Sequence, residues 1–505
     1  MGANVIPEEN ILPRRCREKT EYLIRRCVEA NFNTLRVWGG GHYPEDWFFE
    51  LCDKNGLIVW EDFMFACNLV WMTEDFEATV RAELIDNLKR IRHHASLGLL
   101  CGNNENESFM LSYMQSATME LERADYLRLY CHLIPDMCDK LAPDVFYWSS
   151  SPSSGTPLFN TNDESVGDLH FWKVWGGLSE IERYKRCFTR FCSEFGFQSL
   201  PDYETVEGYT LPEDRNFYSE VVDHHQKNRN GSGKLMFYMA QYYTYPTDFR
   251  KIIYATQLLQ ERAISTAVEH FRRNRGRCMG ALYWQLNDCW PVASWAAIDY
   301  EGRPKALYYA TKRFYAPVLV SANVESKSVS LHVVNERKTA FSGTVNWYLK
   351  DTSFNVISKR SASVELSALK ASRILDIDTS KLSNDNMRNY FLEYELLDES
   401  GEVVSRNTEL LVRPKEFAFT APKFTFGVKK LDGNRFECSV SSDCFARRVK
   451  LSFDGIDVED VSEQYFDITS NSPVCVTVTV RNGDVTAEDI KASLHVLSEA
   501  DLVLI

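Results

Sequence analysis

Leu97-Gly98-Leu99-Leu100-Cys101-Gly102-Asn103-Asn104-Glu105 is an apolar run of strand length that ends in glycine, two asparagines and a carboxylate. A buried strand of a parallel barrel presents catalytic side chains at its C-terminal end in this way. Residues 190–199 form a second strand-like run, in which a single carboxylate, Glu194, lies among aromatic residues. Two carboxylates on two strands of one barrel are the arrangement that cleavage of a glycosidic bond requires.

Strand-like runs and helical spacing alternate through the first 317 residues. Apolar runs predict strands near residues 2–7, 34–38, 57–63, 97–101, 145–149, 166–172, 190–199 and 280–288. Helical spacing appears at residues 23–31, 45–54, 80–91, 124–140, 216–228 and 248–273. This alternation predicts a (β/α)₈ TIM barrel over residues 1–317, with its chemistry on the loops that follow the strands. Glu105 then follows the fourth strand, and Glu194 lies in the seventh.

Beyond Pro317 the period of the apolar residues changes from that of a helix to that of a strand. Apolar residues alternate with polar ones at Val329, Leu331 and Val333, and the same alternation recurs at 345–349, 392–396 and 474–480. This spacing predicts half-buried antiparallel strands. We expect two all-β, immunoglobulin-like sandwich domains, at 318–413 and 414–505, joined by a linker at 411–416. Because the chain stops directly after an apolar run, the second sandwich is expected to be incomplete or to end on a strand.

The composition excludes several classes of protein. A net charge of −14 over 505 residues argues against nucleic-acid binding, which needs clustered Lys and Arg on the phosphate backbone. No signal peptide and no apolar run of membrane-spanning length is present, so no membrane partner is expected. The 14 cysteines have irregular spacings without a CxxC pair, which favours free thiols and a cytoplasmic location.

The two carboxylates divide the work of glycoside cleavage. Retention needs an acid that protonates the departing oxygen and a carboxylate about 5 to 5.5 Å away that attacks the anomeric carbon, whereas inversion needs a wider gap. We assign Glu105 as the general acid and then base, and Glu194 as the nucleophile. Asn104, directly before the acid, is expected to bond a sugar hydroxyl. From spacing alone, surface or ion-pairing glutamates remain an alternative.

Other side chains at the strand ends extend this hypothesis. Tryptophans at three strand ends offer flat faces on which sugar C–H groups stack: Trp38, Trp172 and Trp284. Each of them, taken singly, would also fit a core position. Arg36 and Asp62 are expected to support the glutamates through charge-assisted hydrogen bonds rather than to contact sugar.

The protonation of the site and its need for a metal can also be predicted. An acid must hold a proton near neutral pH, so we expect Glu105 in the less solvated environment and Glu194 beside donors such as Arg36 that keep it ionised. The adjacent histidine pairs 93–94 and 224–225 have no Asp or Cys ligands at a known spacing, so no metal site is expected there.

Four motifs together resemble glycoside hydrolase family 2, and within it the β-mannosidase branch. They are Arg-Val-Trp-Gly-Gly-Gly at 36–41, Gly-Asn-Asn-Glu-Asn-Glu at 102–107, Ser-Glu-Phe-Gly-Phe-Gln-Ser at 193–199 and Tyr-Trp-Gln-Leu-Asn-Asp-Cys-Trp-Pro at 283–291. The resemblance implies an exo-acting, retaining enzyme that removes terminal β-D-mannose from an oligosaccharide or glycan. It also implies Glu105 as acid/base, Glu194 as nucleophile, and a sugar pocket lined by the three tryptophans and Asn104. It implies no metal and no organic cofactor.

Two alternatives stay open. Another exo-β-glycosidase of the same family would cleave galactosides, glucuronides or glucosaminides instead. The resemblance also implies two β domains before the barrel, which this sequence lacks, so the chain is expected to be a truncated version. A truncated, non-hydrolytic carbohydrate-binding protein is therefore the second alternative. The sequence does not predict the oligomeric state.

Overall fold

The structure is a computed structural model that describes residues 1–113, 119–481 and 484–504. Two compact units divide the chain. The first comprises Met1–Arg215, Ser219–Gly231 and Arg262–Tyr315, and the second comprises Asn216–Tyr218, Ser232–Glu261 and Ala316–Ile505. Residues 232–261 thus group with the β-rich half of the chain. The predicted domain boundaries at 317/318 and 413/414 stay predictions.

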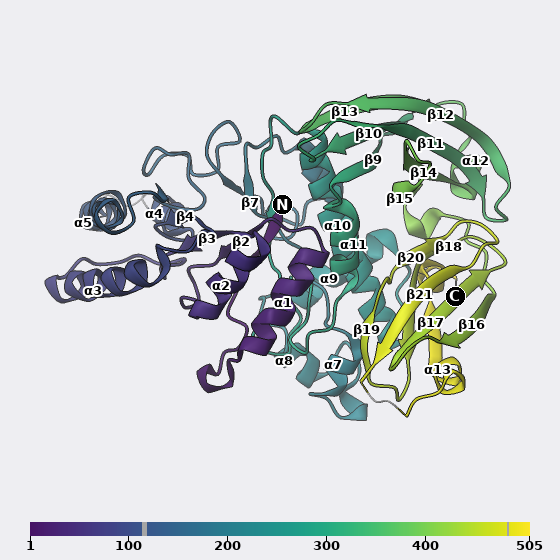
Figure 1. Cartoon of the computed structure of the whole chain (residues 1–505), viewed down its shortest axis with the longest axis horizontal. Helices are drawn as coiled ribbons and strands as arrows, with labels where there is room; N and C mark the ends of the chain where they lie inside the picture. Colours follow the sequence, from purple (N-terminus) through teal and green to yellow (C-terminus); the bar gives the residue numbers. More distant parts are fainter. Residues whose placement is uncertain (114–118, 482–483, 505) are drawn as a thin grey trace. The chain divides into compact units, whose positions relative to one another are not determined.

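The first unit is built on eight strands that pair in parallel, as the alternation predicts (Figure 1). They are β1 (Gly2–Val5), β2 (Thr34–Val37), β3 (Ile58–Asp62), β4 (Leu97–Cys101), β5 (Phe146–Trp148), β6 (Leu169–His170), β7 (Cys192–Glu194) and β8 (Leu282–Tyr283). Six of them form one sheet in the order β5-β4-β3-β2-β1-β8, and β6 pairs with β7. Parallel bridges join the β7 and β8 regions at Cys192 with Ala281 and at Gly196 with Trp284. The TIM-barrel prediction is confirmed.

The strand β6 is shorter than the predicted run over residues 166–172. It begins only after Gly167, which has a φ of 65°. A Cβ at this glycine would lie 1.9 Å from the carbonyl oxygen of Ser153, so the chain here passes too close to a neighbour for any other residue. Asp168, the residue before β6, forms an antiparallel bridge with Ser153 instead of joining the parallel ladder.

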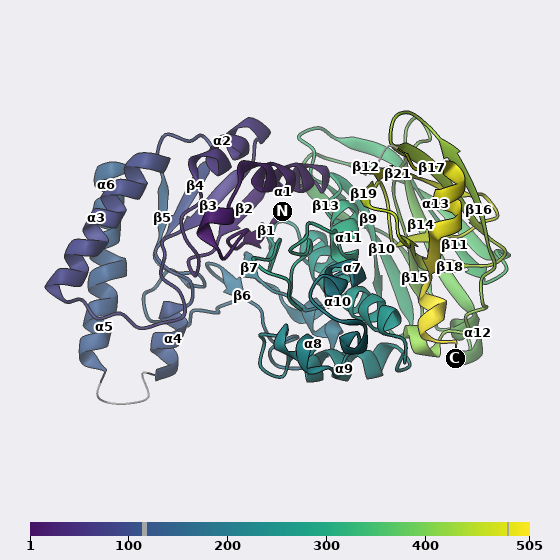
Figure 2. The ribbon, with the colours of Figure 1, turned by 90° about the horizontal axis from the view of Figure 1, so that it is seen from below.

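Amphipathic helices follow most of the barrel strands. They are α1 (Arg17–Glu29), α2 (Asp46–Asn55), α3 (Glu74–Ile91), α4 (Asn106–Tyr113), α5 (Glu120–Leu127), α6 (Ile134–Leu141), α7 (Tyr203–Glu207), α8 (Glu220–His224), α9 (Gly231–Tyr242), α10 (Phe249–Arg273) and α11 (Ala306–Phe314). In α3, the residues Val80, Leu84, Leu88 and Ile91 are buried, which is the predicted apolar stripe. Figure 2 shows α3, α5 and α6 side by side beyond β5, and α3 contacts α6.

Two helix predictions need correction. The predicted helix 124–140 is interrupted by a π-helical segment, Arg128–Leu133, between α5 and α6. Pro135 lies in the first turn of α6, and its missing N–H prevents regular α-helical hydrogen bonding through this region. The predicted helix 216–228 is reduced to α8, which begins after the N-cap Ser219. No helix in the described part of the chain has the length and apolar character needed to cross a membrane.

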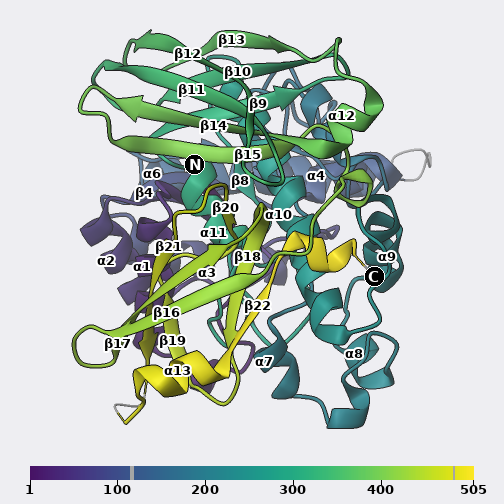
Figure 3. The ribbon, with the colours of Figure 1, turned by 90° about the vertical axis from the view of Figure 1, so that its right-hand side faces the viewer.

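Seven antiparallel strands of the second unit form the first sandwich (Figure 3). One sheet has the order β13-β10-β9 and the other β12-β11-β14-β15. Their bounds are β9 Val318–Val324, β10 Ser328–Asn335, β11 Phe341–Asp351, β12 Val356–Leu366, β13 Lys370–Asp378, β14 Tyr390–Asp398 and β15 Val403–Leu410, with the helix α12 at Asn384–Asn389. The alternating residues of β10 and β11, such as Val329, Leu331 and Trp347, share one buried core. The predicted alternation is confirmed.

The second sandwich follows a short turn at Pro414–Glu416. Its sheets have the orders β16-β17-β21-β19 and β20-β18-β22. The bounds are β16 Phe424–Lys430, β17 Arg435–Ser442, β18 Ala446–Phe453, β19 Val458–Val461, β20 Phe466–Ile468, β21 Val474–Val480 and β22 Leu494–Leu497, with the helix α13 at Ala487–Ser493. Phe436, Val449 and Val478 lie in its core. The two immunoglobulin-like folds expected from the sequence are therefore present.

Candidate active site

Both predicted catalytic carboxylates lie at the C-terminal edge of the barrel strands. Glu194 is the last residue of β7, and Glu105 follows the end of β4 by four residues. Glu105 has a φ of 62°, a left-handed conformation that costs a non-glycine residue free energy and is common at functional sites. An oxygen of Glu105, an oxygen of Glu194 and a ring nitrogen of His170 all lie within 4.8 Å of one another. The fold thus brings together two carboxylates that are far apart in the sequence.

His170, which the sequence reasoning missed, connects the two carboxylates. Its Nδ1 lies 2.8 Å from Oε1 of Glu105 and 3.3 Å from Oε2 of Glu194. Burial acts against protonation of this ring, but the charges of Glu194 and Glu105 outweigh it and raise the pKa of His170. The sequence could have indicated His170 as a site residue. It lies two residues before Trp172, and residues two apart share a face of an extended segment.

Arg36 is fully buried and donates to side chains from four parts of the barrel. Its Nη1 lies 2.7 Å from Oε1 of Glu194 and 2.7 Å from Oδ1 of Asn4. Its Nη2 lies 2.8 Å from Oδ2 of Asp62 and 2.7 Å from Oδ1 of Asn104. Such charge-assisted bonds fix the position of each acceptor. Arg36 therefore contacts one of the two glutamates that it was expected to support, Glu194, and its bonds to Asn4 and Asn104 were not foreseen.

Asp62 and Asn104 are held by further contacts. Asp62 accepts hydrogen bonds from Trp60 Nε1 at 2.8 Å and from the backbone N–H of Gly39 at 3.1 Å. Asn104 has only 2% of its surface exposed, and its Nδ2 donates to the sulfur of Cys67 at 3.4 Å. Asp62 therefore orients Arg36 from behind the carboxylate pair, and Asn104 has little freedom to rotate.

Cys67 is a second residue that the sequence reasoning missed. Its thiol donates to Oε2 of Glu105 across 3.4 Å, on the side of the carboxyl group away from His170. Although Cys67 as a residue is exposed, desolvation of its thiol against the site and the charge of Glu105 raise the pKa of the thiol to about 12, which favours the protonated, donating form. Both oxygens of Glu105 thus have a neighbour that can donate.

One of the three predicted tryptophans contacts a carboxylate, and the other two contact each other. The rings of Trp38 and Trp284 meet edge to face with centroids 5.2 Å apart. Trp172 donates from Nε1 to Oε2 of Glu194 at 3.3 Å, and its ring lies 6.2 Å from that of Trp295, which was not predicted. All three predicted tryptophans are half-buried, so part of each ring faces open space. Trp172 is thus placed beside Glu194, and the role of Trp38 and Trp284 in a sugar pocket stays a prediction.

The protonation expected for the two carboxyl groups is wrong for this site. Burial tends to raise the pKa of Glu105, but the hydrogen bond and charge of His170, with smaller contributions from Cys67 and Arg36, lower it below its ordinary value. At Glu194 burial prevails over the charges of His170 and Arg36, and the pKa is raised. Glu194 is the more buried of the two, with 5% of its side chain exposed against 23% for Glu105, and the charge of Glu105 raises its pKa further. Glu105, in contrast, has the short hydrogen bond of His170.

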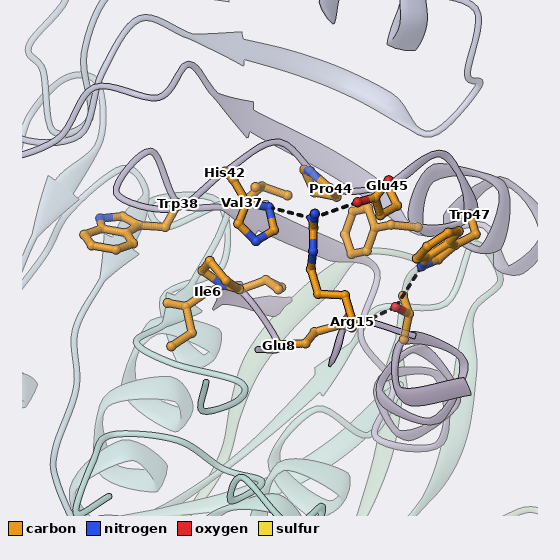
Figure 4. A pocket seen from close by; sticks show the side chains of 13 residues that line it. Ile6, Glu8, Arg15, Val37, Trp38, His42, Pro44, Glu45 and Trp47 are labelled. Carbon is orange, nitrogen blue, oxygen red and sulfur yellow. Dashed lines mark hydrogen bonds and ion pairs between the residues drawn. The ribbon is translucent and has the colours of Figure 1, made fainter. Parts of the chain in front are cut away.

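The cluster of Glu105, His170 and Glu194 has ligand-type atoms close enough to suit a cation. The same atoms also make the hydrogen bond of His170 to Glu105 and its ion-pair contact with Glu194. A neighbouring hollow, shown in Figure 4, is lined by side chains that include Trp38, Arg15 and His42. Trp38 lies at the edge of that hollow, and the two carboxylates are not among its lining residues.

Comparisons with known proteins agree with this architecture. Residues 327–416 match the family model of a Mannosidase Ig/CBM-like domain, and residues 419–502 match that of an Ig-fold domain. The chain is 36% identical to beta-mannosidase B of Thermothelomyces thermophilus in an alignment of 339 positions that covers 63% of this chain and 39% of that protein. It is 30% identical to beta-mannosidase B of Aspergillus niger in an alignment of 508 positions that covers 95% of this chain and 57% of that protein.

A solved structure extends the likeness to the fold. The crystal structure of a beta-D-mannosidase from Dictyoglomus thermophilum superposes with a TM-score of 0.90 at 30% identity, over 98% of this chain and 60% of that one. The resemblance to β-mannosidases predicted from the four motifs is therefore confirmed in sequence and in fold. The chain spans less than two thirds of the length of each of these three relatives.

Proposed function

We propose that this chain carries the catalytic centre of an exo-acting, retaining β-mannosidase, with Glu194 as nucleophile and Glu105 as acid/base. One observation carries the proposal: two carboxylates at the C-terminal edge of the barrel have oxygens within 4.8 Å of each other. The names of the relatives support β-mannoside cleavage. The substrate we propose is a terminal, non-reducing β-D-mannose of an oligosaccharide or glycan.

The separation of the carboxylates favours retention of configuration. Retaining glycosidases hold their two carboxyl groups about 5 to 5.5 Å apart, whereas inverting enzymes need about 6.5 to 9.5 Å to admit a water molecule. The contacts of His170 Nδ1, 2.8 Å to Glu105 and 3.3 Å to Glu194, leave no room for such a water between the facing oxygens. A covalent glycosyl-enzyme intermediate fits this geometry.

Glu194 is suited to the attack on the anomeric carbon. Arg36 holds Oε1 at 2.7 Å, while Oε2 receives only the longer contacts of Trp172 and His170, both at 3.3 Å. Oε2 is therefore the oxygen we propose as nucleophile. It forms a bond to C1 as the bond from C1 to the leaving oxygen breaks, and Arg36 and His170 stabilise the remaining carboxylate charge.

Glu105 completes both halves of the reaction. In the first half it gives its proton to the departing oxygen, and in the second half it takes a proton from the water that attacks C1 and releases Glu194. Its lowered pKa in the substrate-free site suits the second role directly. For the first role the proton must be available nearby, and His170 Nδ1 at 2.8 Å is placed to share it.

The sugar pocket follows from the same residues. The tryptophans Trp38, Trp172 and Trp284 offer partly exposed rings for the C–H faces of mannose. Asn104, which Arg36 and Cys67 hold in place, is the residue we propose to bond the hydroxyl next to the anomeric carbon. Hydrogen bonds at this hydroxyl strengthen in the transition state.

Kinetics with a panel of aryl β-glycosides test the proposal. We expect turnover of aryl β-D-mannosides in preference to galactosides, glucuronides and glucosaminides. Glu194→Ala should lower mannoside turnover by about 10⁴-fold or more, and Glu105→Ala with added azide should form a β-mannosyl azide. Glu50→Ala, which changes an exposed glutamate of α2, is the matched control and should leave turnover unchanged.

Other outcomes of the panel would identify the alternatives. Preferred turnover of another glycoside would indicate a different exo-β-glycosidase on the same catalytic pair. Binding of mannosides without turnover, unaffected by Glu194→Ala, would instead indicate a carbohydrate-binding protein and would contradict the proposal.

We also propose that the protein works in a reducing compartment such as the cytoplasm. All 14 cysteines lie in the described part of the chain and are free thiols, and most of them are buried. Cell fractionation tests this, and recovery from the culture medium would contradict it.

A further inference from the structure

Asp168, which directly precedes β6, has a saturated carboxylate. Its Oδ1 accepts from Trp148 Nε1 at 2.9 Å and from the backbone N–H of Ser153 at 3.0 Å. Its Oδ2 accepts from the hydroxyl groups of Ser151 at 2.7 Å and Ser193 at 2.5 Å. An ionised carboxylate offers about four acceptor sites, and four donors occupy them here. Only 4% of the surface of Asp168 is exposed, so water does not compete with these four donors.

This saturation determines the direction of the next hydrogen bond. A serine hydroxyl has one hydrogen, and that of Ser151 goes to Oδ2 of Asp168 at 2.7 Å in preference to the longer contact with Ser193 Oγ at 3.4 Å. Ser151 Oγ also lies 3.0 Å from Nε2 of His170, and at this contact it can only accept. Nε2 of His170 must therefore carry a hydrogen. Ser151 is fully buried, so water does not compete for this contact.

The fixed hydrogen on Nε2 has a consequence at the other ring nitrogen. Nδ1 faces Glu105 at 2.8 Å and Glu194 at 3.3 Å. A contact of 2.8 Å between a nitrogen and a carboxyl oxygen needs one hydrogen, either on His170 as imidazolium or on Glu105 as carboxylic acid. In both cases the pair of His170 and Glu105 holds one proton beyond the neutral imidazole and the carboxylate.

We propose that Asp168 and Ser151 are positioning residues that fix the tautomer of His170 and so keep a transferable proton on the hydrogen bond between His170 and Glu105. The proposal deepens the proposed function and rests on it for the role of Glu105. In the first half-reaction this proton passes through Glu105 to the leaving oxygen as Glu194 bonds to C1. In the second half-reaction a proton from the attacking water returns to the pair, and the C1–Glu194 bond breaks.

The variant Asp168→Asn reverses the direction of the two hydrogen bonds that join Asp168, Ser151 and His170, with little change in side-chain volume. The Asn carbonyl can still accept from Trp148 and Ser153, while its amide group replaces Oδ2 and donates to Ser151. The hydroxyl of Ser151 then points its hydrogen at Nε2, so the neutral imidazole carries its hydrogen on Nδ1 and the extra proton is lost. Ser151→Ala removes the acceptor at Nε2 and should act in the same direction. A carboxylate that selects a histidine tautomer through direct contact is a known catalytic device.

The first test reads the tautomer without using activity. We would record ¹⁵N–¹H correlation spectra of the full chain labelled at histidine, and assign His170 by comparison with His170→Asn. The expected result is a protonated Nε2 in the parent protein near neutral pH and a change to the Nδ1–H form in Asp168→Asn. An unprotonated Nε2 in the parent, or an unchanged tautomer in Asp168→Asn, would overturn the proposal.

The second test compares leaving groups. Phenyl β-D-mannoside needs acid assistance to depart, whereas 2,4-dinitrophenyl β-D-mannoside does not. In Asp168→Asn we expect kcat/KM for the phenyl substrate to fall by about tenfold or more and that for the dinitrophenyl substrate to change by about twofold or less. An equal loss on both substrates would overturn the proposal, because it is the result of a purely structural role.

Trp148→Phe is the matched control. It removes a donor to Asp168 but leaves the contact between Ser151 and His170 intact, so the ratio of the two kcat/KM values should stay as in the parent. If Trp148→Phe changed the ratio of the two kcat/KM values as much as Asp168→Asn does, the proposed role of Asp168 and Ser151 would be contradicted. If the parent cleaves no mannoside at all, the proposed function is wrong. The ¹⁵N–¹H spectra still show, independently of activity, whether Asp168 and Ser151 fix the tautomer of His170.

Discussion

Two buried arginines, one in each compact unit, have similar surroundings but different roles. Arg36 in the barrel contacts Asp62 at 2.8 Å and Glu194 at 2.7 Å. Arg448 in the β-rich unit contacts Asp467 at 3.0 Å and Glu261 at 3.3 Å. Both arginines are buried, and each carries two acidic partners. Buried ion pairs of this kind stabilise little in themselves, but breaking one is costly.

The carboxylates of the two networks differ in how completely they are satisfied. Asp467 also accepts from the backbone N–H of Arg448 at 2.8 Å and from Thr408 at 2.5 Å. Burial acts against its charge, but Arg448 and its other partners lower its pKa. Glu194 has only one short charged donor, and its pKa is raised. A buried carboxylate with every acceptor site filled is structural, whereas one with an oxygen left reactive can do chemistry.

Among changes to the two arginine networks, the largest effect should come from Arg36→Met. Without the 2.7 Å contact, the charge on Glu194 is buried without its main donor, so its pKa rises further and the nucleophile becomes protonated. We expect kcat/KM for an aryl β-mannoside to fall by about 10³-fold. Steady-state kinetics on the folded protein measure this, and near-normal activity would remove Arg36 from the account.

The counterpart Arg448→Met should affect stability instead. Removing the guanidinium leaves Asp467 and Glu261 buried without their cation, which costs about 3 to 5 kcal/mol in the free energy of unfolding. Urea denaturation monitored in the β-rich unit would show the loss. Below the transition, kcat should equal that of the parent. A variant of normal stability but low activity would break the distinction between the two networks.

Glu107 shows what burial does to a carboxyl group beside neutral donors. It is fully buried, accepts from Leu158 N and Tyr126 Oη, and burial raises its pKa to about 7 from an ordinary 4.5. The folded state then binds a proton that the unfolded state releases, so this group stabilises the fold below about pH 4.5 and the contribution is lost as the pH rises through about 7. Glu107→Gln should be about 1 to 3 kcal/mol more stable than the parent at pH 8 and equal to it at pH 4, below the unfolded-state pKa.

Chemical denaturation of the parent and of Glu107→Gln at both pH values measures this difference. Equal stabilities at pH 8 would mean that Glu107 is ionised in the folded state without cost. Burial at Glu107 would then not raise the pKa of its carboxyl group as it does at Glu194.

The smallest effect is expected from Thr408→Val. Thr408 is buried and donates to Oδ2 of Asp467, and valine keeps its shape without the hydroxyl. Asp467 retains its contacts with Arg448, so the loss should be about 1 to 2 kcal/mol in the free energy of unfolding. Thermal and urea unfolding test this. A loss as large as that of Arg448→Met would show that the hydroxyl, rather than the cation, dominates this network.

Much of the barrel could be predicted because local patterns determine it. Apolar runs and helical stripes identified all eight strands, and the positions of Glu105 and Glu194 at strand ends followed directly. The break of the helix 124–140 into α5, a π-helical segment and α6 was not foreseen, since apolar spacing continues through it. Hydrophobic period alone does not distinguish an α-helix from a π-helical segment.

The site was only partly predictable because closure of the barrel assembles it. The contact of Arg36 with Asn4 joins adjacent strands, but its contact with Glu194 spans 158 positions. His170 was overlooked beside the more conspicuous Trp172, although the two-residue spacing of Asp168, His170 and Trp172 places all three on one face. The alternation used for the sandwich strands would have indicated this shared face.

Covalent trapping determines which residue attacks the anomeric carbon. The full chain would be incubated with 2-deoxy-2-fluoro-β-D-mannosyl fluoride, whose fluorine slows the release of the glycosyl-enzyme, and the labelled peptide identified by mass spectrometry. We predict one fluoromannosyl group per chain, attached to Glu194. A label on Glu105 or another residue, or hydrolysis with inversion and no trapped species, would contradict the account.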